Sequence, residues 1–203
     1  MTVLSIRMIG DPVLRTPAAP VEFAEAGEAV DRGTAELITD MFETMDAVAG
    51  IGLAAPQIGV SRRIFTFDVA GERGAVLNPE LTLLGERSFT AREPEQGSAE
   101  GENLLREGCL SVADIYAPVT RAQQVLLTGT APDGSAVHLE ATGLLAACFQ
   151  HEVDHLDGRL FVDRLSGEDK TAAVRALRSR EYGKAIDQTL GSRKTSHSSF
   201  FAS

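Results

Sequence analysis

The segment His151–His155 carries the residues best suited to chemistry in this chain. It reads His-Glu-Val-Asp-His and lies in a run, residues 143–158, whose apolar positions recur at spacings of three, four and seven. That period predicts a helix, on which positions four apart share one face. His151 and His155 can therefore offer two imidazoles to one metal ion. Glu152, roughly 100° around the helix, can take a proton from a water that the ion binds.

The third ligand must come from elsewhere in the chain, because a catalytic ion of this kind has three protein ligands and one open position. The residue six beyond His155 is Phe161, so the arrangement with a third histidine at that spacing is excluded. In another known arrangement the third ligand is a glutamate from a later helix. Glu168 and Glu181 follow His155, but no pattern marks either of them as a ligand.

The thiol of Cys109, in the segment Glu-Gly-Cys-Leu-Ser, is the favoured third ligand. A thiolate beside imidazoles suits iron(II), zinc, cobalt or nickel. Cys148 is the rival, since it lies on the same helix as the two histidines. One helix can hardly place three ligands around an ion, so we expect Cys148 to be a small buried residue.

The stretch 50–59, Gly-Ile-Gly-Leu-Ala-Ala-Pro-Gln-Ile-Gly, separates a helical pattern from a strand pattern. Its glycines allow the backbone to approach a ligand or another strand closely. Gln57 carries a neutral amide that can donate hydrogen bonds to a developing oxyanion. The alternative is a tight loop that only packs on the core.

Three of these segments together resemble the signature motifs of the peptide deformylase family, in that family's order. They are residues 50–57, 107–111 and 150–158, and the resemblance extends over roughly residues 3–165. It implies a hydrolase that removes the N-formyl group from the formylmethionine of nascent polypeptides and releases formate. It also implies iron(II) as the native ion, with zinc, nickel or cobalt as replacements.

The resemblance assigns roles to individual residues of this chain. It implies that the metal ligands are Cys109, His151 and His155, and that Glu152 is the general base. The oxyanion donors would be the Gln57 amide and the backbone N–H of Leu110. The substrate-binding residues would be Ile51, Gly52, Leu144 and Cys148, of which Ile51, Leu144 and Cys148 match positions that line the methionine pocket. Arg121 would form an ion pair with Asp154.

The chain departs from the family pattern at Ala113, where a proline usually follows the second motif. Loss of the proline frees the backbone just beyond the thiolate ligand. No ligand, base or oxyanion donor is affected, so we expect an active enzyme with an altered substrate grip near Tyr116.

The elements that must position these residues are readable from periodicity. Residues 31–48 carry a helical stripe, 63–69 and 75–77 form strand patterns, and 123–129 with 135–141 flank a turn as a hairpin. His138 falls on the polar face of that hairpin and His197 in the polar tail, so neither is a candidate ligand. We expect an α+β fold, with small, mainly antiparallel sheets packed around a central metal-binding helix.

Composition bounds the remaining possibilities. A length of 203 residues with 43% apolar content predicts one domain with a sizeable core. The net charge of −10 argues against a general nucleic-acid or anionic-membrane surface. No apolar run reaches the length of a membrane span, no signal peptide opens the chain, and two cysteines suit a reducing compartment, so we expect a cytoplasmic protein.

The chain divides into a catalytic domain over 1–168, a C-terminal helix within 169–190 and a disordered tail over 191–203. The acidic stretch 85–106 is expected to be an inserted loop, either solvated without a role or placed near the mouth of the site. The helical pattern at 168–184 is expected to be a solvated surface helix, although the resemblance also allows a transient ribosome contact.

Two other functions stay open at this point. An H-E-x-x-H metallopeptidase would cleave internal amide bonds and would need a ligand other than Cys109. A non-catalytic, metal-stabilised module would close the fourth position of the ion with a protein group.

Overall fold

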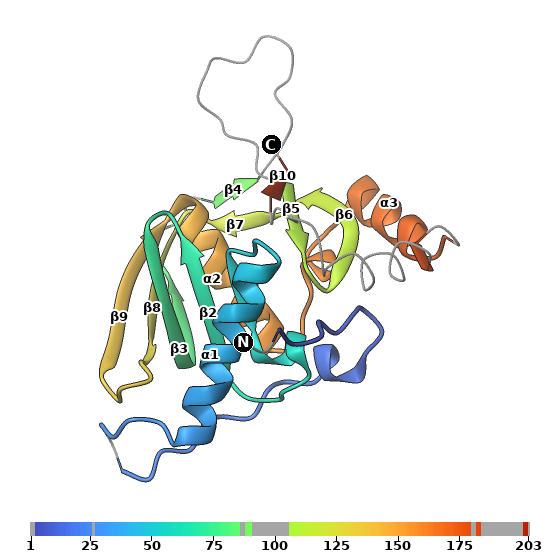
Figure 1. Ribbon diagram of the computed structural model, residues 1–203. Coiled ribbons are helices and arrows are strands. Elements are labelled where there is room, and N and C mark those ends of the chain that lie inside the picture. Colours follow the sequence, from blue (N-terminus) through green and yellow to red (C-terminus); the bar gives the residue numbers. More distant parts are fainter. Residues whose placement is uncertain are drawn as a thin grey trace.

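The computed structural model describes residues 3–25, 27–85, 88–90, 106–179, 182–183 and 201–202. Within these ranges it combines α-helices with antiparallel sheets, which confirms the expected α+β class (Figure 1). None of the helices in the described part of the chain has the length and apolar character needed to cross a membrane.

The largest sheet has five strands in the order β1-β2-β3-β8-β9, and each neighbouring pair is antiparallel. The predicted hairpin forms its outer edge as β8 and β9, with Leu127 opposite Leu139. The strands span Gly52–Ala54, Ile64–Val69, Glu72–Leu83, Gln124–Thr130 and Ala136–Thr142.

Two smaller sheets complete the β structure of the described residues. One has the order β10-β5-β6, with strands Phe201–Ala202, Arg106–Cys109 and Val112–Pro118, and the other pairs β4 (Ser88–Thr90) with β7 (Thr120–Ala122). The strand β10 lies in the segment expected to be disordered. It adds to the edge of β5, whose backbone N–H and C=O groups are available for pairing.

Several expectations fall on parts of the chain that the structure does not describe. Apart from β10, the expected tail 191–203 lies outside the described residues. So does most of the expected insertion, residues 86, 87 and 91–105.

The helices are α1 (Arg32–Ala47), α2 (Gly143–Leu156) and α3 (Gly167–Leu177), with short 3-10 turns η1 (Pro12–Arg15), η2 (Ala55–Ile58) and η3 (Phe161–Asp163). The first helix begins after Asp31, whose carboxylate accepts a hydrogen bond from the Thr34 backbone N–H at 3.0 Å. The last helix is shorter than the pattern at 168–184 predicted.

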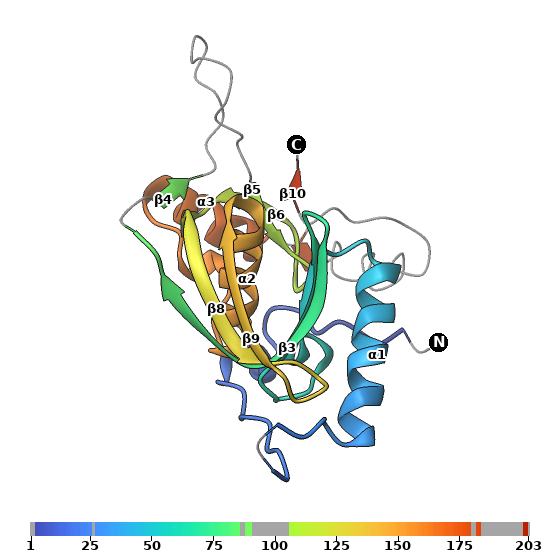
Figure 2. The ribbon, with the colours of Figure 1, turned by 90° about the vertical axis from the view of Figure 1, so that its left-hand side faces the viewer.

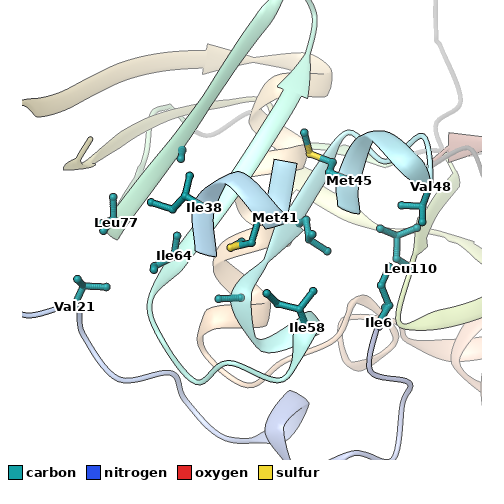
Figure 3. Packing of buried hydrophobic residues seen from close by; sticks show 13 residues of the cluster. Ile6, Val21, Ile38, Met41, Met45, Val48, Ile58, Ile64, Leu77 and Leu110 are labelled. Carbon is teal, nitrogen blue, oxygen red and sulfur yellow. The ribbon is translucent and has the colours of Figure 1, made fainter. Parts of the chain in front are cut away.

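The helices α1 and α2 cover opposite faces of the five-stranded sheet, as Figure 2 shows. Alternation along β2 explains this arrangement, because neighbouring side chains on a strand point to opposite faces. Ile64 packs under α1 with Met41 and Met45 (Figure 3), whereas Phe65 packs under α2 with Phe149. The second helix is therefore buried, and its polar residues need partners inside the protein.

A third apolar cluster joins the three-stranded sheet β10-β5-β6 to α3, at the opposite side of the molecule from β9 (Figure 1). It contains Val112 and Ile115 of β6 together with Leu160 and Phe161. This cluster holds β5 and its Cys109 end against the segment that follows α2.

Candidate metal centre

The helix α2 carries His151 and His155 on one face, and both side chains are buried. Their Nε2 atoms lie 3.1 Å apart, and their rings meet nearly edge to face with centroids 4.8 Å apart. The spacing of four residues thus produces the convergence that the helical period predicted.

The strand β5 brings the Cys109 thiol to the same point. Its Sγ lies 3.2 Å from Nε2 of His155, and the three candidate ligand atoms all lie within 4.8 Å of one another. The other thiol is elsewhere. Cys148 is buried in the apolar cluster around Phe149, and its Sγ donates to the Ile51 carbonyl at 3.6 Å.

The donor set fits a divalent metal ion. A sulfur and two ring nitrogens at these separations are compatible with ligand bonds of about 2.0–2.3 Å to one ion. Burial raises the pKa of the Cys109 thiol to about 12, and the nearby charge of Glu152 adds to this effect while the Ser111 backbone N–H opposes it. A thiolate at neutral pH therefore requires a cation beside it.

The Glu152 carboxyl group is fully buried next to this cluster. Neither of its oxygens has a hydrogen-bond partner among the described residues. Burial, and then the charge of Glu107, raise the pKa of Glu152 well above its usual value. Such a group can both accept and return a proton, which is the property that general acid–base catalysis needs.

The turn η2 holds the side chain of Gln57 over the thiol. Its Oε1 accepts a hydrogen bond from the Ala54 backbone N–H at 2.8 Å, which orients the amide. Its Nε2 then lies 3.8 Å from Sγ of Cys109 and 3.4 Å from Oγ of Ser111. A hydrogen-bond donor thus faces the candidate centre, together with the backbone that runs from Cys109 into the buried Leu110.

A chain of buried charges supports the histidines from behind. Nδ1 of His151 lies 2.5 Å from Oε1 of Glu107, whose two oxygens also accept hydrogen bonds from Arg121 at 2.5 and 3.0 Å. Burial by itself would raise the pKa of Glu107, but the contacts with His151 and Arg121 hold it at about 2. Arg121 in turn reaches Asp154 at 2.7 Å, as expected, and Arg164 pairs with the same carboxylate.

Sequence reasoning overlooked Glu107 and Arg164 in this network. A signal existed for Glu107, because a metal-binding histidine usually donates its second ring N–H to a carboxylate or a carbonyl. Its position two residues before the candidate thiolate made it a natural partner. No spacing in the sequence predicts that Arg164 pairs with Asp154. Arg164 directly follows the turn η3, which returns the chain toward α2.

The residues expected to line a methionine pocket also come together. Ile51 and Leu144 are half-buried and pack against the apolar cluster that contains Cys148. Gly52 follows Ile51 as the first residue of β1 and faces the side chains of Cys148 and Glu152. The apolar cluster therefore meets Glu152, next to the candidate centre, at Gly52 and Cys148.

Of the remaining candidates, the structure describes His138 and Glu168 but not His197 and Glu181. His138 and Glu168 are exposed. Ala113 is buried in β6, so the position where the family usually has proline is part of a paired strand in this structure.

Comparisons with known proteins agree on one family. The family model described as polypeptide deformylase matches residues 3–171. The peptide deformylase of Acidothermus cellulolyticus is 45% identical over 183 residues, which are 90% of this chain and 89% of that protein. Peptide deformylase 1 of Corynebacterium efficiens is 42% identical over 187 residues, which are 90% of this chain and 98% of that protein.

Solved structures of peptide deformylases also resemble the fold of this chain. The crystal structure of peptide deformylase from Thermus thermophilus superposes with a TM-score of 0.74 at 36% identity, covering 92% of this chain and 99% of that one. The peptide deformylase from Ehrlichia chaffeensis in complex with actinonin gives a TM-score of 0.73 at 31% identity, covering 89% and 99%.

Proposed function

From the premise that this chain belongs to the polypeptide deformylase family, we propose a role for each residue of the centre. The activity itself is that of the family. The chain is a metal-dependent hydrolase that removes the N-formyl group from the formylmethionine start of nascent polypeptides and releases formate.

We propose that Cys109, His151 and His155 hold the divalent ion. The supporting observation is their convergence within 4.8 Å from two separate elements, β5 and α2. When bound, the ion supplies Lewis-acid polarisation and lowers the pKa of a coordinated water. The soft thiolate beside two imidazoles leads us to propose iron(II) as the native ion, with zinc, nickel or cobalt as substitutes.

Glu152 acts as the general base and acid in this proposal. It takes a proton from the attacking water as the new C–O bond forms at the formyl carbon. It then delivers that proton to the departing nitrogen as the C–N bond breaks, which leaves formate and a free amino group. Its buried carboxylate supports this role, because neither oxygen is engaged in a hydrogen bond with the described residues and both are free to accept a proton.

The Gln57 amide and the backbone N–H of Leu110 would donate hydrogen bonds to the oxyanion that develops on the formyl oxygen. The methionine side chain would enter the apolar border formed by Ile51, Gly52, Leu144 and Cys148. This border belongs to an apolar cluster that meets Glu152 at Gly52, so a thioether chain could lie beside the hydrolytic centre.

The proposed cellular location and partner of the enzyme follow from its substrate. A nascent chain carries its formyl group in the cytoplasm and at the ribosome, so we propose a cytoplasmic enzyme that makes a transient ribosome contact. No element of the structure is assigned to that contact.

The assignment is tested by a formate-release assay on a formyl-Met peptide, with protein prepared without oxygen and loaded with iron(II). We expect formate release that is lost on chelation and recovers when iron(II) is returned. Cleavage of internal amide bonds, with the formyl group left in place, would favour the metallopeptidase alternative instead.

A further inference from the structure

The strand β1 passes directly against the carboxylate of Glu152 at Gly52. A Cβ atom at position 52 would lie 2.9 Å from Cδ of Glu152, nearer still to its Oε1, and 3.0 Å from Sγ of Cys148. Non-bonded carbon atoms prefer about 3.5–4.0 Å. Any side chain at this position would therefore have to displace the proposed base.

The backbone conformation does not require glycine at this position. The glycines with positive φ in this chain include Gly59 and Gly158, but Gly52 is not among them. It lies in an extended strand, paired with Phe67 of β2, where any residue fits the backbone. What demands a glycine is the close approach of another group.

The carboxylate has little room to retreat. Glu152 is fully buried on α2, and the neighbouring Phe149 and Leu156 are fully buried as well. The strand is equally fixed, because Leu53 and Ala54 are completely enclosed. With no hydrogen-bond partner among the described residues, the carboxylate is located by contact with β1 and not by a polar anchor.

We propose that Gly52 is a positioning residue for the reaction. Its missing side chain forms the slot that holds the Glu152 carboxylate against β1 and beside the ligand cluster. This role is separate from the substrate-binding role expected from the sequence, and it rests on the proposed function of Glu152 as the general base.

A double-mutant cycle on the metal-loaded enzyme tests the contact itself. Gly52→Ala is expected to lower Tm by about 3–10 °C, the range expected for overpacking in a domain of this size. The same substitution made together with Glu152→Ala should cost less than half as much, because the nearest clashing atoms are gone. An equal Tm loss in both backgrounds would overturn the inference.

The matched control is Gly74→Ala on β3. A Cβ atom there would lie 3.0 Å from the Phe67 ring, so the crowding is comparable, but the contact does not involve Glu152. We expect this variant to lower Tm by the same amount with either residue at position 152, and to leave kcat unchanged.

Kinetics then separate positioning from a general packing defect. Gly52→Ala is expected to lower kcat on a formyl-Met peptide by about 10²-fold, since a misplaced base loses most of its contribution. Metal content should be unchanged and KM should stay within about threefold. A loss confined to KM, or a loss of metal, would contradict the positioning role.

The outcomes distinguish this inference from the proposed function. Should Gly52→Ala fail to fold, recovery of folding by the added Glu152→Ala substitution supports the contact, and continued unfolding overturns it. An active Glu152→Ala enzyme would instead refute the base assignment, while the Tm cycle would still report whether the two residues meet.

Discussion

Nδ1 of His151 lies 2.5 Å from Oε1 of Glu107, so a proposed metal ligand on α2 is held by a carboxylate on β5. The same strand carries Cys109 at its end. The two elements that supply the proposed ligands are therefore joined twice, at the ligand cluster and through the buried charges behind it. This arrangement fixes the ring of His151 before any ion binds.

Glu107→Gln should weaken metal binding by about 10–100-fold, because the substituted amide no longer offers His151 a charged acceptor. Competition with a chelator measures the change in affinity. The control is Glu140→Gln on the exposed side of β9, which should leave metal affinity unchanged. Equal affinities in the two variants would show that the contact with His151 does not tune the site.

Cys109→Ala should abolish tight metal binding, since only two imidazoles would remain from the cluster. Cys148→Ala should retain a full complement of metal, because that thiol packs among apolar residues and contacts the Ile51 carbonyl. Elemental analysis of both purified variants decides between them. The opposite pattern would assign the thiolate to α2.

Glu152→Ala should bind metal as the parent chain does but release formate about 10²–10⁴-fold more slowly, which is the usual contribution of a general base. The measurement pairs metal content with kcat on a formyl-Met peptide. Near-normal kcat in a metal-loaded variant would remove Glu152 from the mechanism.

Arg121→Ala should cost about 3–5 kcal/mol in the free energy of unfolding, because Glu107 and Asp154 would lose their shared partner inside the protein. Arg32→Ala is the contrasting variant, since its ion pair with Glu36 lies on the surface and should not matter measurably. Urea denaturation at fixed metal concentration compares the two. A small loss for Arg121→Ala would contradict this prediction and would mean that Arg164 alone compensates the charge of Asp154 and His151 alone that of Glu107.

Much of the scaffold was predictable because it depends on local periodicity. The helical stripe at 31–48 appears as α1, and the alternating segments around 130–135 appear as β8 and β9. The pairing of His151 with His155 was equally accessible, since a helix places residues four apart on one face whatever surrounds it. The preference for Cys109 over Cys148 followed from the geometry of a single helix, and the motif resemblance added the Leu110 backbone N–H and the pairing of Arg121 with Asp154.

Tertiary structure decided which distant groups meet. Cys109 and His155 are 46 positions apart, and only the packing of β5 against α2 brings them to 3.2 Å. Packing between elements also brings Glu107 and Arg164 into the charge network. It likewise places Gly52 against Glu152. Local spacing sets the direction of side chains within one element, whereas the distance between elements depends on how their apolar faces pack, which no short segment encodes.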